Sequence, residues 1–355
     1  MKHRIRELST LQIREAQAAG LSPWVARPRF VLECLASFQP INRWLRQSVE
    51  IFWASCLRSP ESKMLLTLSI SLICLTATQA AEPPKAKIAI VGGTFINDAL
   101  FGNSVLKSSF TVPTPSGESP KIHYGEVEGV PFYYVHMHGE GKWVATWQAL
   151  AQLGVKEVLG GATAGGINVA MKIYDCVVPH DFIDVNVDRP KSISLPDRPG
   201  DIPRYVPPMD PLLRQILIDE TRRAVRAQPS FNDINVLEKG VIVQAAGGRF
   251  ETAAEIAAFQ RMGGDLVTMS VGTEISYARQ LGINYACLVV ISNPAEGIGA
   301  WTWDDIRNVY PRMNPLCVDI LLKAVPRVAK IGDGPREGDK LRFHPPMTSK
   351  KEEKK

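Results

Sequence analysis

Apolar residues follow two different periods along the chain after residue 85. Short β-branched runs at 88–91, 155–159 and 285–291 predict buried strands, whereas the spacing of Trp143, Trp147 and Leu150 predicts a helix over residues 143–153. Gly154 follows this helix as a stop signal. Strands and helices therefore alternate, which predicts an α/β fold with a mainly parallel sheet.

The second half of the chain continues this alternation. The apolar pattern predicts a helix after Phe250 that buries Ile256, Phe259 and Met262. It then predicts a strand at 266–271 and a helix at 273–281 that ends at Gly282. Thr302 and Asp305 are spaced as the N-cap of a C-terminal helix. Residues 189–211 are rich in proline and charge, and we expect them to form a long surface excursion that acts as a lid or an interface.

Three glycine-bearing segments stand out against this background. They are Val91–Thr94, Ala162–Gly166 and Ala246–Glu255. The first two follow apolar runs, so each is predicted to be a strand that ends in a tight turn, and the third continues into a helix. Such turns expose backbone N–H groups at the carboxyl edge of a sheet, where open α/β folds bind anions and nucleotides.

The order of these segments resembles the purine nucleoside phosphorylase and methylthioadenosine phosphorylase family, over residues 86 to 325. Gly247–Glu255 is similar to the family block G-P-S-F-E-T-x-A-E, and Gly264–Glu274 is similar to G-A-D-x-V-G-M-S-T-V-P-E. The resemblance implies a single domain, over residues 85–330, with a mixed, mainly parallel sheet flanked by helices. It also implies phosphorolysis of a purine nucleoside, giving free purine and a pentose 1-phosphate, without a metal or an organic cofactor, by a homo-oligomer that is expected to be a trimer.

The resemblance assigns residues to the purine. Asn293 stands where the family has its base-contacting Asn or Asp, Glu251 matches the Glu that accepts from N1–H, and Phe250 would stack on the base. A side-chain amide can donate to a 6-oxo group, whereas the Asp of methylthioadenosine phosphorylases accepts from a 6-amino group. The pair of Asn293 and Glu251 therefore predicts a preference for 6-oxopurines. Without the resemblance, Asn293 would be interpreted as a turn residue and Glu251 as a favourable charge at a helix N-terminus.

The resemblance also assigns the phosphate and ribose contacts. Thr94, Ser270 and the backbone around Thr163 match phosphate ligands, and Met269 matches a residue that lines the ribose. His136 resembles the phosphate-side His of the family segment H-M-Y-E-G, which places His138 where a ribose-contacting Tyr is expected.

One departure concerns the phosphate. The family has an Arg two residues before this His, where the chain has Tyr134. In an alternative alignment with the Arg-His-Gly of the methylthioadenosine branch, Met137 takes the Arg position and precedes His138. The guanidinium that would clamp an oxyanion is absent from both places, and Arg204 or Arg249 are candidates to replace it. Because this Arg is absent, a nucleoside hydrolase and a nucleoside-binding protein stay open as alternatives. A methylthioadenosine phosphorylase is a further alternative, with related chemistry. A dinucleotide-binding dehydrogenase is disfavoured, because the first segment lacks the G-x-G-x-x-G order.

The N-terminal region has a different character. Residues 64–80 form a short apolar run that ends in small residues, which is typical of a signal peptide cleaved before Ala81. We therefore expect translation to start at Met64, residues 1–63 to be a spurious or disordered extension, and the protein to be exported to the periplasm or secreted. If translation starts earlier, the protein is expected to be cytoplasmic. The alternative for 64–80 is a buried or membrane-associated helix.

The net charge and the cysteine content bear on two further functions, nucleic-acid binding and metal binding. The net charge is +5, but residues 1–63 hold ten Lys and Arg against five Glu, so the rest of the chain is neutral. Nothing in this balance favours binding to nucleic acid. Cys176, Cys287 and Cys317 would remain after cleavage, and we expect them to be core thiols without metal-ligand spacing. Residues 336–355 are predicted to be a charged tail.

Overall fold

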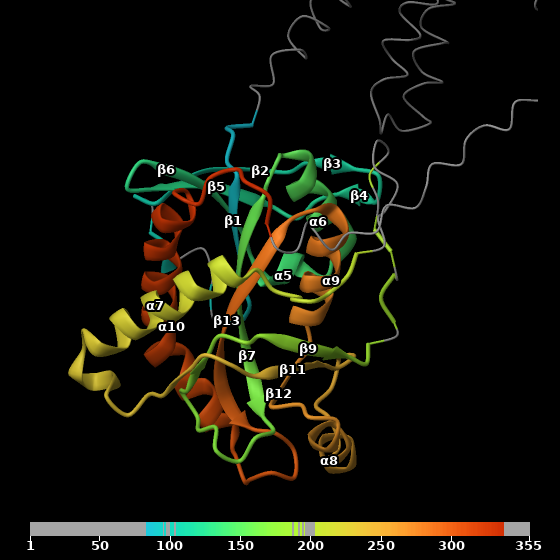
Figure 1. Ribbon diagram of the computed structural model, residues 1–355, viewed down its shortest axis with the longest axis vertical. Coiled ribbons are helices and arrows are strands. Elements are labelled where there is room, and N and C mark those ends of the chain that lie inside the picture. Colours follow the sequence, from blue (N-terminus) through green and yellow to red (C-terminus); the bar gives the residue numbers. More distant parts are fainter. Residues whose placement is uncertain are drawn as a thin grey trace, which may run out of the picture. The chain divides into compact units, whose positions relative to one another are not determined.

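The structure is a computed structural model that describes residues 83–336, except for 95, 97–99, 103, 187, 191, 194 and 196–202 (Figure 1). The chain divides into one unit that ends at Glu82 and another that begins at Pro83. The first unit, with the predicted signal peptide and extension, lies outside the described residues, and so does most of the predicted tail.

The second unit contains both strands and helices. Its longer strands are β1 (Ile88–Val91), β2 (Leu106–Phe110), β5 (Ile122–Val127), β6 (Val130–Val135), β7 (Glu157–Gly166), β9 (Asp181–Asp184), β11 (Val241–Gln244), β12 (Leu266–Thr268) and β13 (Asn284–Pro294). Its helices are α5 (Met137–Glu140), α6 (Trp143–Gln152), α7 (Pro211–Arg226), the 3-10 turn η2 (Pro229–Phe231), α8 (Ala253–Arg261), α9 (Val271–Leu281) and α10 (Trp303–Val328).

Four parallel strands form the centre of the sheet. They run in the order β13-β7-β1-β6, and β13 and β7 pair over almost their whole length. Antiparallel strands extend the sheet beyond β6, where β5 and β2 follow, and β12 pairs with the end of β7 in antiparallel fashion. Four strands of the described chain have two residues each: β3 (Pro113–Thr114), β4 (Gly117–Glu118), β8 (Cys176–Val177) and β10 (Val236–Leu237).

 β3 and β4 pair with each other in a separate two-stranded sheet, and β8 lies between β10 and β13 in the main sheet. This is the mixed, mainly parallel sheet that the sequence predicts.

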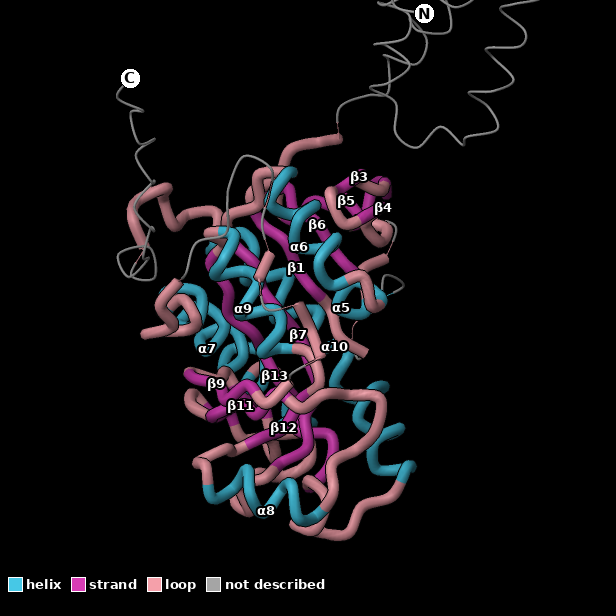
Figure 2. Tube along the Cα trace, turned by 90° about the vertical axis from the view of Figure 1, so that its right-hand side faces the viewer, coloured by secondary structure: helices cyan, strands magenta, loops and turns pink. Residues whose placement is uncertain are grey.

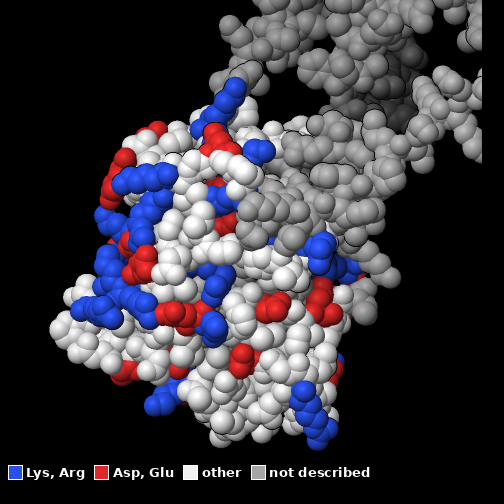
Figure 3. Space-filling view, in the orientation of Figure 1, with Lys and Arg blue, Asp and Glu red and all other residues white. Residues whose placement is uncertain are grey.

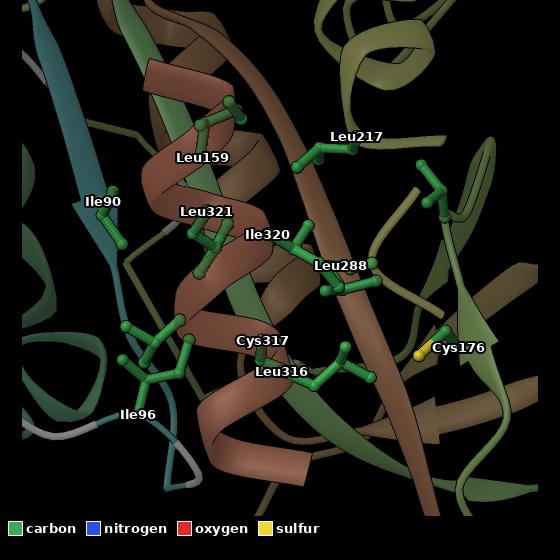
Figure 4. Close-up of a cluster of buried hydrophobic side chains, with 14 of the residues drawn as sticks. Ile90, Ile96, Leu159, Cys176, Leu217, Leu288, Leu316, Cys317, Ile320 and Leu321 are labelled. Atoms are coloured by element: carbon green, nitrogen blue, oxygen red, sulfur yellow. The ribbon is translucent and has the colours of Figure 1, made fainter. Parts of the chain in front are cut away.

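The central strands are buried on both faces, as strands with helices on either side must be, whereas β2 at the edge of the sheet is largely exposed. Along β1, Ile88 and Ile90 belong to one apolar cluster, whereas Ala89 and Val91 belong to another. Helices α7 and α10 cover the first face, and α6 and α9 cover the second (Figures 1 and 2). Figure 4 shows α10 over the first face, with Leu316, Cys317, Ile320 and Leu321 near Ile90, Leu159 and Leu288. Each fully buried Leu or Ile stabilises the fold by roughly 1.5–3 kcal/mol relative to an exposed side chain.

Capping residues set several of the helix ends as expected. Thr302 and Asp305 form a capping box at the start of α10, so the prediction of an N-cap there is confirmed. Thr252 and Glu255 do the same for α8. Gly282 ends α9 in the left-handed conformation, with φ of 77°.

Two predictions for individual segments are wrong. Met262 is 53% exposed, because it lies at the C-cap of α8, where the buried face of the helix ends. The strand predicted at 155–159 does not end in a turn at Ala162–Gly166, because β7 continues to Gly166. A side chain at Gly160 would clash there, since a Cβ atom would lie 2.1 Å from the Tyr285 hydroxyl. The glycines of β7 thus allow close packing within the sheet instead of forming a turn.

The surface over α7 and α10 carries acidic and basic side chains next to each other, on the left in Figure 3. Arg223 contacts Glu220 and Asp319, and Arg327 contacts Asp219 and Glu220. Exposed pairs of this kind contribute little stability individually, so the packing beneath them holds these helices in place. Within the described part of the chain, no helix combines the length and the apolar character needed to cross a membrane.

Candidate active site

A cavity of about 480 Å³ lies where the carboxyl ends of the parallel strands meet. The ends of β1, β7, β12 and β13 and the segment after β6 contribute to its wall, as do the residues before α8 and the first turns of α10. Ligands bind at this edge of open α/β sheets because the chain turns there and leaves backbone groups free. Eight of the nine site residues expected from the sequence line the cavity: Thr94, His138, Thr163, Phe250, Glu251, Met269, Ser270 and Asn293.

Two threonines come together at one end of the cavity, and Ser270 also lines the cavity. The hydroxyl oxygens of Thr94, after β1, and Thr163, in β7, lie 3.5 Å apart. Ser270 precedes α9, and its side chain makes no capping bond to the helix. A helix N-terminus attracts anions, because its first N–H groups are unpaired and its dipole is positive there. This end of the cavity therefore has the donors that an oxyanion requires.

The segment after β6 brings His138 to the same end. The backbone N–H of His138 donates to the carbonyl of Gly92 over 2.8 Å. A Cβ atom on Gly93 would lie 2.8 Å from His138 Nε2, so this ring nitrogen lies directly against the first glycine segment. The Gly93 position thus needs glycine for the close approach of the imidazole.

The backbone of this segment is in an unusual conformation. Met137, His138 and Glu140 all have positive φ, between 46° and 53°, and Gly139 and Gly141 continue the run. Left-handed backbone in residues other than glycine costs free energy and clusters at functional sites. This strained backbone lies where the chain leaves β6 and places His138 in the wall of the cavity.

His136 is the expected site residue that does not line the cavity. Its Nδ1 lies 3.1 Å from the Tyr134 hydroxyl, which also donates to the carbonyl of Ile96. The geometry gives no support to a phosphate contact by His136 and favours the alternative alignment, in which His138 takes that place.

The residues expected to contact a purine lie in β13 and before α8. Asn293 is 3% exposed, follows a register shift in β13, and accepts a hydrogen bond from the Ser292 hydroxyl on its Oδ1. Its Nδ2 donates to the Pro294 carbonyl over 2.8 Å. An amide NH₂ has two hydrogens, so one remains for a ligand. Asn293 is therefore oriented by its neighbours and still able to donate.

Glu251 lies in the same wall. Burial raises the pKa of its carboxyl group, and the carboxylates of Glu255 and Glu296 raise it further, while Arg249 lowers it. Phe250 packs against Trp301 and Trp303, with ring centroids 5.2 and 5.7 Å away. Aromatic rings beside a carboxylate and an amide form a site suited to a flat heterocycle with donors and acceptors on its edge.

The charge of the cavity is unusual for an anion site. Glu140, Glu251 and Glu296 line it, and none of the described residues that line it is Lys or Arg. Arg249 pairs with Glu255 outside the cavity, and Arg204 is exposed and does not line it. Neither replacement for the missing Arg is thus in place, and His138 is the lining residue that can carry a positive charge.

Sequence reasoning missed several lining residues. Trp303, Ile306 and Tyr310 form one face of α10, and Trp143 stacks on the His138 ring at 5.9 Å with an interplanar angle of 21°. The spacing of three and four residues in α10 was the available signal, but it is equally typical of core packing. Among the described residues, no group of three or more His, Cys, Asp or Glu side chains is arranged to hold a metal ion. Cys176, Cys287 and Cys317 are free and buried, as expected.

Known proteins are similar to this chain in sequence and in fold. The 6-oxopurine nucleoside phosphorylase of Pyrococcus furiosus is 30% identical over 69% of the chain and 94% of its own length. A probable S-methyl-5′-thioinosine phosphorylase of Xylella fastidiosa is 33% identical over 60% of the chain and 90% of its own length. The methylthioadenosine phosphorylase of Schistosoma mansoni, solved with adenine, is 26% identical, with a TM-score of 0.59 over 69% of the chain and 92% of its own.

The model of the phosphorylase superfamily matches residues 87–326. This range covers the central sheet, the helices on both of its faces and the cavity. The protein belongs to the phosphorylase superfamily, and its likeness to the purine nucleoside and methylthioadenosine phosphorylases of that family is confirmed.

Proposed function

We propose that the protein cleaves the N-glycosidic bond of purine nucleosides with phosphate, releasing the purine and a pentose 1-phosphate, and that it prefers 6-oxopurines. One observation carries the proposal: a single cavity joins an amide and a carboxylate suited to a purine edge with three hydroxyls suited to an oxyanion. The relatives named as 6-oxopurine nucleoside phosphorylases support the same reaction.

The purine residues would act on the leaving group. As the bond to the base lengthens, the sugar becomes cationic and the purine gains electron density, so catalysis requires groups that stabilise the departing base. The free N–H of Asn293 would donate to the base, and the Glu251 carboxylate would accept from N1–H. Phe250 would cover the ring, with Trp301 and Trp303 behind it.

The nucleophile would bind at the other end. Thr94, Thr163 and Ser270 supply hydroxyls, and His138 lies beside the first glycine segment. Phosphate there would lie on the sugar side of the base and attack the cationic carbon. A nucleoside hydrolase or a nucleoside-binding protein stays the alternative, since the described part of the lining contains neither Lys nor Arg.

A second candidate differs only in the sugar. The side of the cavity formed by α10 is apolar and aromatic, with Trp303, Ile306 and Tyr310. Such a wall would accept a 5′-methylthio group, which cannot form the hydrogen bonds of a hydroxyl. The relatives named as S-methyl-5′-thioinosine phosphorylases support this candidate.

The test is base release with and without phosphate from inosine, guanosine, adenosine, methylthioinosine and methylthioadenosine. We expect release to require phosphate and to be faster with 6-oxopurines. Release without phosphate would instead support a hydrolase, and tight binding without release would support a nucleoside-binding protein. A comparison of inosine with methylthioinosine shows whether the protein prefers a 5′-hydroxyl or a 5′-methylthio group on the sugar.

We also infer three properties of the whole protein. The family resemblance supports a homo-oligomer, with a trimer as the expected size, and phosphate as co-substrate without a further cofactor. The apolar run at 64–80 supports export, if translation starts at Met64. Size-exclusion chromatography with light scattering, activity after treatment with a chelator and N-terminal sequencing of the exported protein test these three inferences in turn.

A further inference from the structure

The His138 ring is held by a carboxylate from a distant part of the chain. Its Nδ1 lies 2.6 Å from Oε1 of Glu274, in α9, 136 residues further on. Trp143 stacks on the ring and fixes its plane. The imidazole is thus anchored through one nitrogen, while Nε2 lies against Gly93 at the phosphate end of the cavity.

Glu274 is completely buried, with a relative exposure of 0%. Its second oxygen accepts from the Tyr285 hydroxyl, in β13. Burial raises the pKa of Tyr285 well above its ordinary value, and Glu274 raises it further, so the phenol keeps its proton and acts as the donor. A buried carboxylate is costly without partners, and Glu274 has two.

Two of the side chains around His138 are acidic. Glu274 faces it from α9, and Glu140 lies on its own segment and lines the cavity. Trp143 from α6 and Gly93 after β1 carry no charge. Behind Glu274, β13 presents Tyr285 and Cys287, and burial keeps both of them protonated by raising their pKa values.

We propose that Glu274 is a positioning residue that holds Nδ1–H of His138 and stabilises its imidazolium form, so that Nε2–H donates to phosphate in place of the missing Arg. The inference rests on the proposed function. An ionised Glu274 attracts the proton that the ring gains, and phosphate, as the third partner, receives a charge-assisted hydrogen bond. Both protons stay on the imidazole while phosphate is bound, and no bond is formed or broken at His138.

The experiment compares Glu274→Gln with Tyr285→Phe. The amide of Gln still accepts from Nδ1–H but removes the negative charge, so we expect KM for phosphate to rise roughly ten- to hundredfold while KM for inosine stays within about twofold. Tyr285→Phe removes the other hydrogen bond to the same carboxylate and keeps its charge, so the rise is expected to be much smaller. A role in folding alone would affect both KM values, and it would affect both variants alike.

A double-mutant cycle completes the test. Once His138→Gln has removed the imidazole, Glu274→Gln should add little to KM for phosphate. Additive effects, or an unchanged KM for phosphate in Glu274→Gln, would overturn the inference. If Glu274→Gln does not fold, His138→Gln decides: it offers neutral donors, and an unchanged KM for phosphate there would also overturn it. Base release by the wild type without phosphate would contradict the proposed function itself, and the inference with it.

Discussion

The side-chain oxygens of Thr94 and Thr163 lie 3.5 Å apart, although 69 residues separate them in the chain. The parallel pairing of β1 with β7 brings the two strand ends together. If both hydroxyls hold phosphate, Thr94→Val and Thr163→Val should each raise KM for phosphate about tenfold and leave KM for the nucleoside unchanged. Thr111→Val is the control, because its hydroxyl donates to Glu118 at the surface and Thr111 is not among the residues that line the cavity. Steady-state kinetics at varied phosphate measure the effect, and equal changes in both KM values would argue against it.

We expect Asn293 to determine which base is preferred. The wild type should favour inosine and guanosine over adenosine, and Asn293→Asp should reverse the order, because a carboxylate repels a 6-oxo group and accepts from a 6-amino group. A mismatched hydrogen bond to a charged group costs about 1.5–3 kcal/mol, or roughly a ten- to hundredfold change in the ratio of kcat/KM values. An unchanged ratio in the variant would show that Asn293 does not contact the purine.

The pH dependence of activity should follow the ionisation of Glu251. Its carboxylate must be ionised to accept from N1–H, and its pKa is raised by burial and by Glu255 and Glu296. Activity should therefore be lost on the acid side at a pH above the ordinary range of a glutamate. Glu296→Gln removes one of the charges that raise this pKa, so the acid limb of kcat/KM for inosine should move to lower pH. A limb that stays in place would exclude Glu251 as the titrating group.

Gly139 supports the segment that carries His138. Its φ is 87°, and a Cβ atom there would lie 2.0 Å from Oγ1 of Thr146. Gly139→Ala should therefore displace the segment and lower kcat/KM at least about tenfold. Gly129→Ala is the matched control, since Gly129 has a similar φ of 78° and a Cβ atom there would have no neighbour within 4 Å. It should lower the free energy of unfolding by about 1–2 kcal/mol and leave kcat/KM unchanged. Equal kinetics in both variants would contradict a role for the contact with Thr146.

Strands and helices with a clear apolar period could be predicted from the sequence. β1 and α6 lie where the periodicity places them, and β13 is longer than predicted by a few residues at its ends. Helix α7 was not predicted, because its Asp210 cap and Pro211 follow a proline-rich stretch that masks the signal. The extended β7 was missed for a related reason: glycines suggest a turn unless the packing of Tyr285 against Gly160 is known.

The candidate site, like the fold, could be predicted from the sequence only in part. Short motifs identified the residues at strand ends, because parallel pairing gathers them at one edge. They could not decide between His136 and His138, since the left-handed segment after Val135 determines which ring enters the cavity. Nor could they connect His138 to Glu274, because only the packing of α9 against the sheet brings these residues together.

The dependence of inosine cleavage on phosphate tests the central claim most directly. Hypoxanthine release would be measured with phosphate and after its complete removal, in the wild type and in Asn293→Ala. We predict that release requires phosphate, yields one pentose 1-phosphate for each hypoxanthine, and is strongly reduced in the variant. Hypoxanthine released at the same rate without phosphate, with free pentose as the product, would contradict the assignment as a phosphorylase.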